Sequence, residues 1–238
     1  PCIGNIYVHT NTTIEDHADH VIQVLTVLNQ WKLRINRSKC FFGYTAVNVL
    51  GHLLSGDSRQ PDPAKLRTLA RWPQPKTGSA IESFLGFTNY LRDFVPLYSS
   101  VAAPLESLRK LKHLGTAWTP ACEHSFQMLK KILSNPPVLN SPLPEVPYCL
   151  DTDASQHGVG WVLYQIDPLT QLPRYILFGA KALHKGQKNY GATRRELLAI
   201  IVAIEHCRQY IYGRRFTLFT DHKALTYLFT QKHINYMM

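Results

Sequence analysis

The sequence is short of paired cysteines, of long apolar runs and of acidic residues. Its five cysteines are scattered over 238 residues and none forms a Cys-x-x-Cys pair, so neither a zinc site nor a disulfide framework is indicated. No apolar run reaches the roughly 18 residues that span a bilayer, and no signal-peptide pattern is present. These absences predict an intracellular protein, in the cytoplasm or the nucleus, with no membrane partner.

The shortage of acid leaves a strongly basic chain. Lys and Arg number 26 against 16 Asp and Glu, which gives a formal net charge of +10. Such an excess favours a polyanionic partner, although it concerns association rather than fold. The apolar content of 45% is ordinary for a globular protein, and the length allows one or two domains with a real core.

Prolines cluster in the middle of the chain. Five prolines fall within the thirteen residues 135–147, and such a cluster predicts a linker and a domain boundary. Before it, apolar periodicity and capping residues predict a short strand at 32–36, a hairpin at 47–54 and several helices. These helices are expected at 13–30 with Thr13 as N-cap, 62–72 with Asp62, 79–95 with Ser79, 99–111, and 119–133 with Thr119.

Four acidic positions, on three predicted elements, stand out after the linker. The run 148–155 reads as a strand in which Asp151 and Asp153 project from the same face. Glu196 lies at the edge of the apolar stripe of a predicted helix over 190–212, and Asp221 ends a β-rich run. A carboxylate in a strand is costly unless it is exposed, paired or bound to metal. A solvated sheet face therefore remains the plain alternative to a metal site.

The stretches that carry these acids resemble the ribonuclease H domain of gypsy-type LTR retrotransposon polyproteins. The three motifs occur in the family's order and spacing: Thr-Asp-Ala-Ser at 152–155, Arg-Glu-Leu-Leu-Ala-Ile at 195–200 and Phe-Thr-Asp-His-Lys-Ala-Leu at 219–225. Upstream motifs resemble the end of the palm and the thumb of the same family's reverse transcriptase: Val-Leu-Gly-His at 49–52, Trp-Pro-Gln-Pro at 72–75, Ser-Phe-Leu-Gly-Phe-Thr-Asn-Tyr at 83–90 and Ala-Pro-Leu at 103–105.

The resemblance implies an α/β (α+β) fold in four parts. We expect a partial reverse transcriptase palm at 1–60, a helical thumb at 61–134 and the proline-rich linker at 135–147. An incomplete ribonuclease H-like domain, a mixed sheet with helices, is expected at 148–238.

For the site, the resemblance implies two-metal hydrolysis of RNA in RNA–DNA hybrids. Asp153 would bridge two magnesium ions, for which manganese can substitute, and Glu196 and Asp221 would complete the leaving-group side. Asp151 would support them from the same strand face. The family has a fourth aspartate several dozen residues after the third, and the 238 residues end before that position. The resemblance therefore implies crippled cleavage by this chain.

The resemblance also implies contacts with an RNA–DNA hybrid or another duplex. Gly51 and His52 match the segment that grips the primer end, although an edge hairpin is the plain alternative. In the thumb-like part the candidates are Asn89, Tyr90 and Arg92, for which helix packing is the alternative, and the basic residues Lys110 and Lys112.

Polymerase activity is not expected of this chain. Gly4 and Asn5 stand where the family has the two metal-binding aspartates of its polymerase turn, and neither offers the anionic oxygen that Mg²⁺ prefers. The alternative to an active ribonuclease is a non-catalytic nucleic-acid-binding remnant or a domesticated interaction module. A reading frame that continues beyond Met238 to a further aspartate would favour the enzyme.

Overall fold

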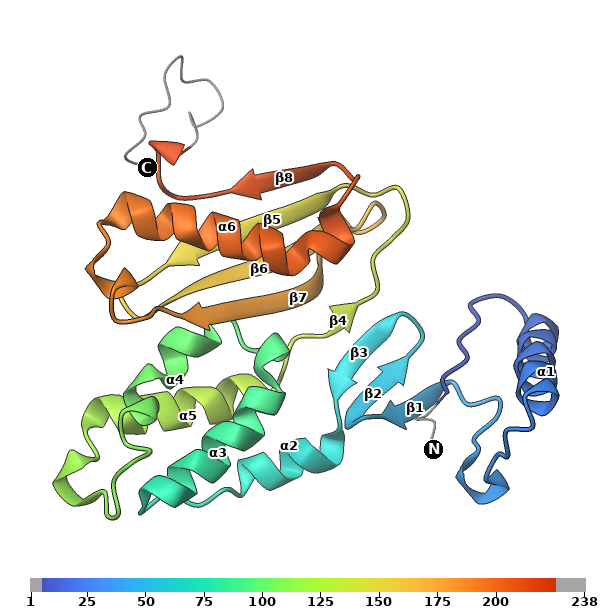
Figure 1. Ribbon diagram of the computed structural model, residues 1–238, viewed down its shortest axis with the longest axis horizontal. Coiled ribbons are helices and arrows are strands. Elements are labelled where there is room, and N and C mark those ends of the chain that lie inside the picture. Colours follow the sequence, from blue (N-terminus) through green and yellow to red (C-terminus); the bar gives the residue numbers. More distant parts are fainter. Residues whose placement is uncertain (1–5, 226–238) are drawn as a thin grey trace.

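The structure, a computed structural model, describes residues 6–225. The chain forms an N-terminal arm at 6–45, a small sheet of strands β1–β4, a helical unit of helices α2–α5, and a larger C-terminal sheet of strands β5–β8 covered by helix α6 (Figure 1). None of the helices in this described range is long and apolar enough to cross a membrane.

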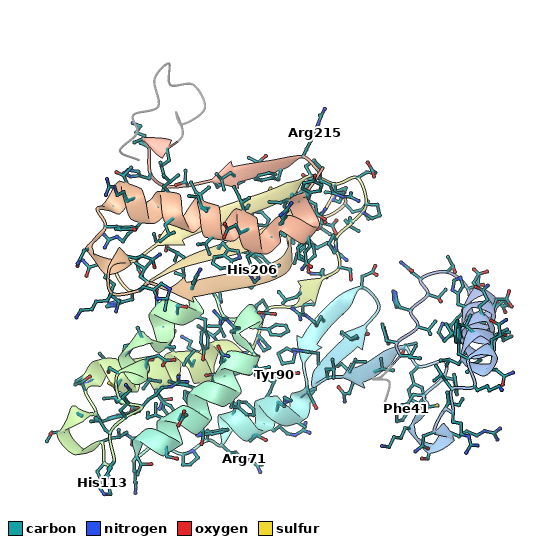
Figure 2. All side chains as sticks on the ribbon, in the orientation of Figure 1. Phe41, Arg71, Tyr90, His113, His206 and Arg215 are labelled. Carbon is teal, nitrogen blue, oxygen red and sulfur yellow. The ribbon has the colours of Figure 1, made fainter. Side chains whose placement is uncertain are left out.

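The N-terminal arm has little contact with the rest of the molecule. Helix α1 (Ile14–Gln30) begins as predicted, because the Thr13 hydroxyl accepts from the Asp16 N–H and the Asp16 carboxylate accepts from the Thr13 N–H. No residue of α1 is buried, and the Phe41 ring projects from the arm with 69% of its surface exposed (Figure 2). The predicted strand at 32–36 is wrong: no described strand lies there, and the 3₁₀ helix η1 (Arg37–Lys39) follows.

The small sheet joins the predicted hairpin to the proline-rich segment. Strands β1 (Ala46–Val49), β2 (His52–Ser55), β3 (Ser58–Pro61) and β4 (Leu139–Asn140) pair antiparallel in that order. Strand β4 comes from within residues 135–147. Its Leu139 side chain is buried in the core of the helical unit.

The helical unit follows local start signals closely. Helix α2 (Pro63–Ala70) is capped by Asp62 and α5 (Pro120–Ser134) by Thr119, each with a proline in its first turn. Helix α3 (Gly78–Tyr90) is capped by Thr77, so the prediction of Ser79 as its cap is wrong. The remaining elements are the 3₁₀ helices η2 (Arg92–Phe94) and η3 (Gly115–Ala117) and helix α4 (Tyr98–Glu106).

The C-terminal sheet is mixed, as expected. Its order is β7-β6-β5-β8, and only β5 and β8 are parallel. The strands are β5 (Tyr148–Ala154), β6 (Gly158–Ile166), β7 (Pro173–Ala182) and β8 (Phe216–Phe219); the 3₁₀ helix η4 (Gln187–Asn189) and α6 (Ala192–Ile211) precede β8. Helix α6 packs on one face of the sheet through an apolar cluster that includes Leu150, Leu163 and Ala203 (Figure 1).

The helical unit packs on the other face of this sheet. Helix α4 contacts β6 and β7, and η2 contacts β7. Phe178 and Ala180 of β7 belong to the same apolar cluster as Phe84 and Phe126 of the helical unit. The two units therefore share one apolar core and are not connected by a flexible linker alone.

One buried side chain holds the proline-rich segment in place. The Gln165 amide on β6 is fully buried, accepts from the Leu143 N–H, and donates to the carbonyls of Leu143 and Val146. Three proline-flanked backbone groups thus find partners on the sheet. Although its composition predicts a linker, this segment has a fixed path.

We expect Gln165→Ala to lower the free energy of unfolding by about 2–3 kcal/mol, because it removes three hydrogen bonds and leaves buried backbone groups unpaired. Urea unfolding measures this loss. The control is Gln127→Ala, which removes an exposed amide that bonds only Glu123 and should change stability by less than about 0.5 kcal/mol. Equal effects of the two substitutions would contradict the role of Gln165.

Candidate active site

Glu196 is the buried acid of the candidate site. It lies in the second turn of α6 with 7% of its surface exposed, and its Oε2 atom has no hydrogen-bond partner. Burial raises the pKa of its carboxyl to about 7, and the charges of Asp221 and Asp153 add to the rise. The sequence placed Glu196 at the edge of a buried face, and the structure buries it with like charges nearby.

Asp153 and Asp221 lie at the ends of neighbouring strands. Asp153 is the next-to-last residue of β5, Asp221 follows β8, and both are exposed. The ends of the two strands are tied together by the Thr152 hydroxyl, which donates to the Phe219 carbonyl at 3.3 Å. A hydrogen bond of 2.8 Å between His222 Nε2 and Thr193 Oγ1 holds the segment after β8 against the start of α6. The three carboxylates thus come from elements that meet at one end of the sheet.

The carboxylates interact electrostatically without forming a closed ligand set. Among residues 6–225, no group of three His, Cys, Asp or Glu side chains is close enough to hold a metal ion. The two observations agree, since charge interactions reach about 10 Å and ligation needs oxygens at about 2 Å. That the three carboxylates converge within one metal pocket stays a prediction.

The Glu196 carboxyl fits a divalent cation. Its buried oxygen lacks a partner, and neighbouring acids disfavour its charge. Hard carboxylate oxygens of this kind suit magnesium or manganese. A cation between Glu196, Asp153 and Asp221 would relieve the repulsion that raises the Glu196 pKa.

Asp151 makes a separate contact on the strand. Its half-buried carboxylate accepts from the Tyr164 hydroxyl at 3.2 Å. Burial raises the pKa of Asp151 and, together with the Asp151 charge, that of Tyr164. That Asp151 supports the metal ligands stays a prediction, and the contact it makes is with β6.

Gly51 and His52 lie against the end of α3. The His52 ring stacks on the Tyr90 ring with centroids 5.2 Å apart, and Lys65 Nζ lies 4.2 Å from the Tyr90 centroid. Gly51 has a φ of +72°, and a Cβ there would lie 2.5 Å from Lys65 Cε and 2.8 Å from the Tyr90 hydroxyl. The positive φ favours glycine, and a larger residue would also push the ends of the Lys65 and Tyr90 side chains aside. The structure thus brings together three of the predicted nucleic-acid contacts, Gly51, His52 and Tyr90.

Lys65, which was not predicted from the sequence, completes this cluster: Lys65 comes from α2 and Tyr90 from α3. Burial lowers the pKa of His52, and the charges of Arg59 and Lys65 lower it further. The imidazole is therefore neutral at pH 7, and its buried Nδ1 atom has no partner.

The other predicted contacts differ in their surroundings. Arg92 is half-buried: it donates to the carbonyls of Ala180 and of the Asn89 side chain, and its guanidinium lies over the Tyr98 ring. Arg92 therefore bonds the helical unit to the C-terminal sheet. Asn89, Lys110 and Lys112 are exposed. Their nucleic-acid contacts, like that of Arg92, stay predictions, and Gly4 and Asn5 lie outside the described residues.

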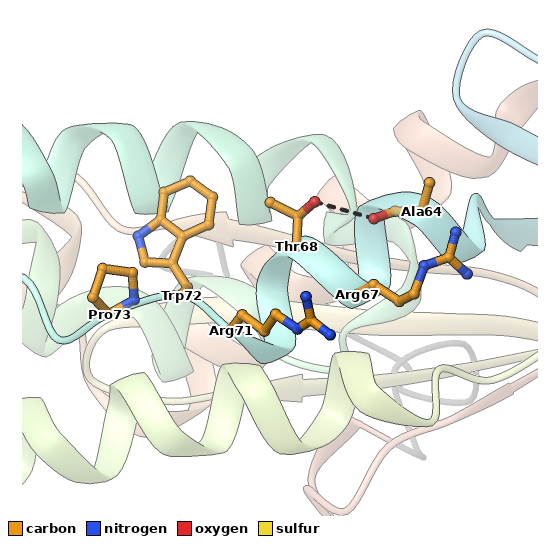
Figure 3. Close-up of a pocket in the computed structure, with 6 residues that line it drawn as sticks. All are labelled: Ala64, Arg67, Thr68, Arg71, Trp72 and Pro73. Carbon is orange, nitrogen blue, oxygen red and sulfur yellow. Dashed lines mark hydrogen bonds between the residues drawn. The ribbon is translucent and has the colours of Figure 1, made fainter.

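Two arginines that sequence reasoning missed line a hollow on α2. Arg67 and Arg71, one helical turn apart, border an open hollow of about 470 Å³ together with Ala64, Thr68, Trp72 and Pro73 (Figure 3). Within residues 6–225 the ion pairs are Arg59–Asp93 and Arg109–Glu106, so neither arginine has an acidic partner there. The signal in the sequence was the i, i+4 basic pair, which is unfavourable without an anion.

Comparison with known proteins identifies the chain's family. Residues 118–218 match the family model described as the RNase H-like domain found in reverse transcriptase. The chain is 35% identical over 215 residues to the "Retrovirus-related Pol polyprotein from transposon 412" of Drosophila melanogaster, which covers 89% of the chain and 17% of that protein. The "Transposon Tf2-7 polyprotein" of Schizosaccharomyces pombe is 34% identical over 225 residues, 94% of the chain and 17% of that protein.

The chain belongs to the retrotransposon Pol polyproteins of the gypsy and Tf2 type. It covers the region of the C-terminal end of the reverse transcriptase and the RNase H-like domain, and spans about a fifth of the length of these relatives.

Solved structures show the same fold. The foamy viral protease-reverse transcriptase in complex with RNA/DNA hybrid superposes with a TM-score of 0.72 at 17% identity, over 94% of this chain and 31% of that one. The foamy viral protease-reverse transcriptase in complex with dsDNA superposes with a TM-score of 0.71 at 18% identity, over 94% of this chain and 46% of that one. The mixed α/β fold therefore resembles the thumb and connection region of a reverse transcriptase with an RNase H-like domain. The sequence motifs predicted the α/β fold, the thumb and the RNase H-like domain.

Glu196→Gln should stabilise the metal-free protein at pH 8 by on the order of 1–3 kcal/mol. The folded protein binds the Glu196 proton more tightly than the unfolded chain does, so wild-type stability falls as pH rises from about 4.5 to about 7. The glutamine variant lacks this loss, and the two proteins should converge near pH 4.5. Urea unfolding across this pH range measures the difference.

The matched control is Glu205→Gln on the exposed side of the same helix, which should leave the pH profile of wild type unchanged. Mg²⁺ at pH 8 should raise the melting temperature of wild type and not that of Glu196→Gln. Parallel pH profiles of stability for wild type and Glu196→Gln would show that folding does not disfavour the charged form of Glu196.

Proposed function

We propose that this chain acts as the thumb and ribonuclease H part of a retrotransposon polyprotein, and that it hydrolyses RNA in RNA–DNA hybrids. The observation that carries the proposal is the buried Glu196 carboxyl. It accepts from the Ala154 backbone N–H, but its Oε2 atom has no hydrogen-bond partner, and burial beside Asp221 and Asp153 raises its pKa. A structural carboxylate would be paired or solvent-exposed. A buried, repelled carboxyl is instead typical of a functional site.

Asp153, Glu196 and Asp221 would hold magnesium, with manganese as a substitute. When bound, the ions supply charge stabilisation at the scissile phosphate and a more acidic water. The protein's own part is to keep Glu196 out of solvent on α6 and to bring Asp153 and Asp221 to adjacent strand ends. The domain division at 60, 134 and 147 remains part of this proposal.

A non-catalytic nucleic-acid-binding remnant or a domesticated interaction module is the second candidate. The observation that favours it is that no group of three ligating side chains is close enough to hold a metal among residues 6–225. This candidate keeps the basic surface and needs no hydrolysis. The two candidates differ in whether a bound hybrid is cut.

Asp153→Asn should abolish cleavage of an RNA–DNA hybrid in Mg²⁺ while it leaves hybrid binding within about twofold, because asparagine has the same size but cannot neutralise two ions. Product RNA on a denaturing gel measures cleavage. Asp167→Asn in the β6–β7 turn, where the side chain caps two backbone N–H groups, is the matched control and should cut like wild type. Wild type that binds hybrid without cutting it would favour the non-catalytic candidate.

The helical unit is proposed to hold the duplex by its phosphates. The support is the pair Arg67 and Arg71, without acidic partners among the described residues, and the exposed Lys110 and Lys112. Each phosphate contact releases counterions, so affinity falls as salt rises. The structural relatives bound to dsDNA and to RNA/DNA hybrid support the same type of partner.

The double variants Arg67→Ala/Arg71→Ala and Lys110→Ala/Lys112→Ala should each make the slope of log affinity against log salt shallower by about 2. Fluorescence anisotropy of a labelled duplex at four salt concentrations measures it. The double variant Arg37→Ala/Lys39→Ala removes the same charge from η1 of the arm and should change the slope by less than about 0.5. If every variant had the same salt slope as wild type, the duplex would bind at a surface other than these four basic residues.

A further inference from the structure

We propose that the helical unit positions Asp153, through Leu97 and Ser100 at the start of α4. Neither residue would touch the substrate, so both are positioning residues. The proposal rests on the proposed function in one respect, namely that Asp153 is a metal ligand. It predicts that the acidic site of the C-terminal sheet is complete only when the helical unit is docked.

Leu97 fills the space beside the strand neighbour of Asp153. Gly160 of β6 pairs directly with Asp153 of β5, so both residues lie on the same face of the sheet. A Cβ on Gly160 would lie 2.2 Å from Leu97 Cδ2 and 3.4 Å from Leu97 Cγ, so the Leu97 side chain would have to move. The glycine therefore lets the Leu97 side chain lie at the position opposite Asp153.

Ser100 holds the turn that follows Asp153. The Ser155 hydroxyl accepts from the N–H groups of His157 and Gly158, at 3.1 and 3.0 Å. The Ser155 hydroxyl also donates to the Gly158 carbonyl at 3.0 Å. Ser100 Oγ lies 2.8 Å from Ser155 Oγ, in a hydrogen bond for which either hydroxyl can be the donor. The turn two residues beyond Asp153 is thus bonded to α4.

Leu97 keeps an uncommon backbone conformation at this contact. Its φ is +51°, in the left-handed region, and it is the N-cap residue of α4 without a side-chain capping bond. A leucine there costs about 1–2 kcal/mol. Such strain persists when the surroundings fix the conformation, and it tends to cluster at functional positions. Packing of the Leu97 side chain against Gly160 is what this conformation achieves.

The first test uses a clash and its relief. Gly160→Ala should weaken Mn²⁺ binding by about 10- to 100-fold, the usual cost of disturbing a ligand's support. Adding Leu97→Ala to Gly160→Ala should restore most of the affinity, because it removes the atoms that collide with the new Cβ. Water proton relaxation measures Mn²⁺ binding on the full chain. Gly186→Ala is the control, because a Cβ there meets nothing within 4 Å.

Two results would overturn the proposal. A folded Gly160→Ala chain that binds Mn²⁺ like wild type would show that the contact does not position Asp153. Lost affinity that Leu97→Ala does not restore would show that the new Cβ, and not the helical unit, disturbs the site.

A second measurement separates this proposal from the proposed function. Ser100→Ala should speed amide hydrogen exchange in the turn 153–158 by about fivefold, the effect of one lost hydrogen bond. Ser83→Ala, an exposed serine of α3, should not. If wild type binds no Mn²⁺, the proposed metal site fails and exchange alone decides the positioning. Unchanged exchange in Ser100→Ala would overturn the proposal whatever the metal result.

Discussion

The helical unit and the C-terminal sheet share one apolar core, and the position of the acidic site depends on it. Phe178 and Ala180 of the sheet belong to the same apolar cluster as the phenylalanines of α3 and α5, so separating the two units would expose apolar surface from both. The start of α4 then lies beside β6 and the turn that follows β5, close to Asp153, the next-to-last residue of β5. Burial fixes this arrangement, and the absence of a side chain at Gly160 permits it.

The same burial sets the electrostatics of the site. Glu196 enters from α6 on the opposite face of the sheet and loses water without gaining a hydrogen bond for Oε2. Its charge is then disfavoured by burial and by the neighbouring acids. In the proposed metal site stability and function would pull in opposite directions, because the buried carboxyl costs stability while no cation is bound.

Much of the fold could be predicted because its signals are local. Thr13, Asp62 and Thr119 start their helices through bonds to backbone groups two or three residues away. The acids could be singled out because their motifs occur in a known order. Signals that depend on a distant partner failed: the alternation at 32–36 finds no neighbouring strand among the described residues, and the proline-rich segment is fixed by Gln165, 18 to 30 positions further along the chain.

The sequence by itself determined the family, the mixed α/β architecture and the identity of the three acidic residues, because these follow from motifs and short-range periodicity. Only the tertiary structure decided that Glu196 is buried with one oxygen, Oε2, left without a hydrogen bond, that Arg92 bonds β7, and that Leu97 and Ser100 meet the strand and turn of Asp153. The physical reason is that burial, repulsion and close packing are properties of side chains far apart in the sequence. They exist only once the helical unit and the sheet have closed on each other.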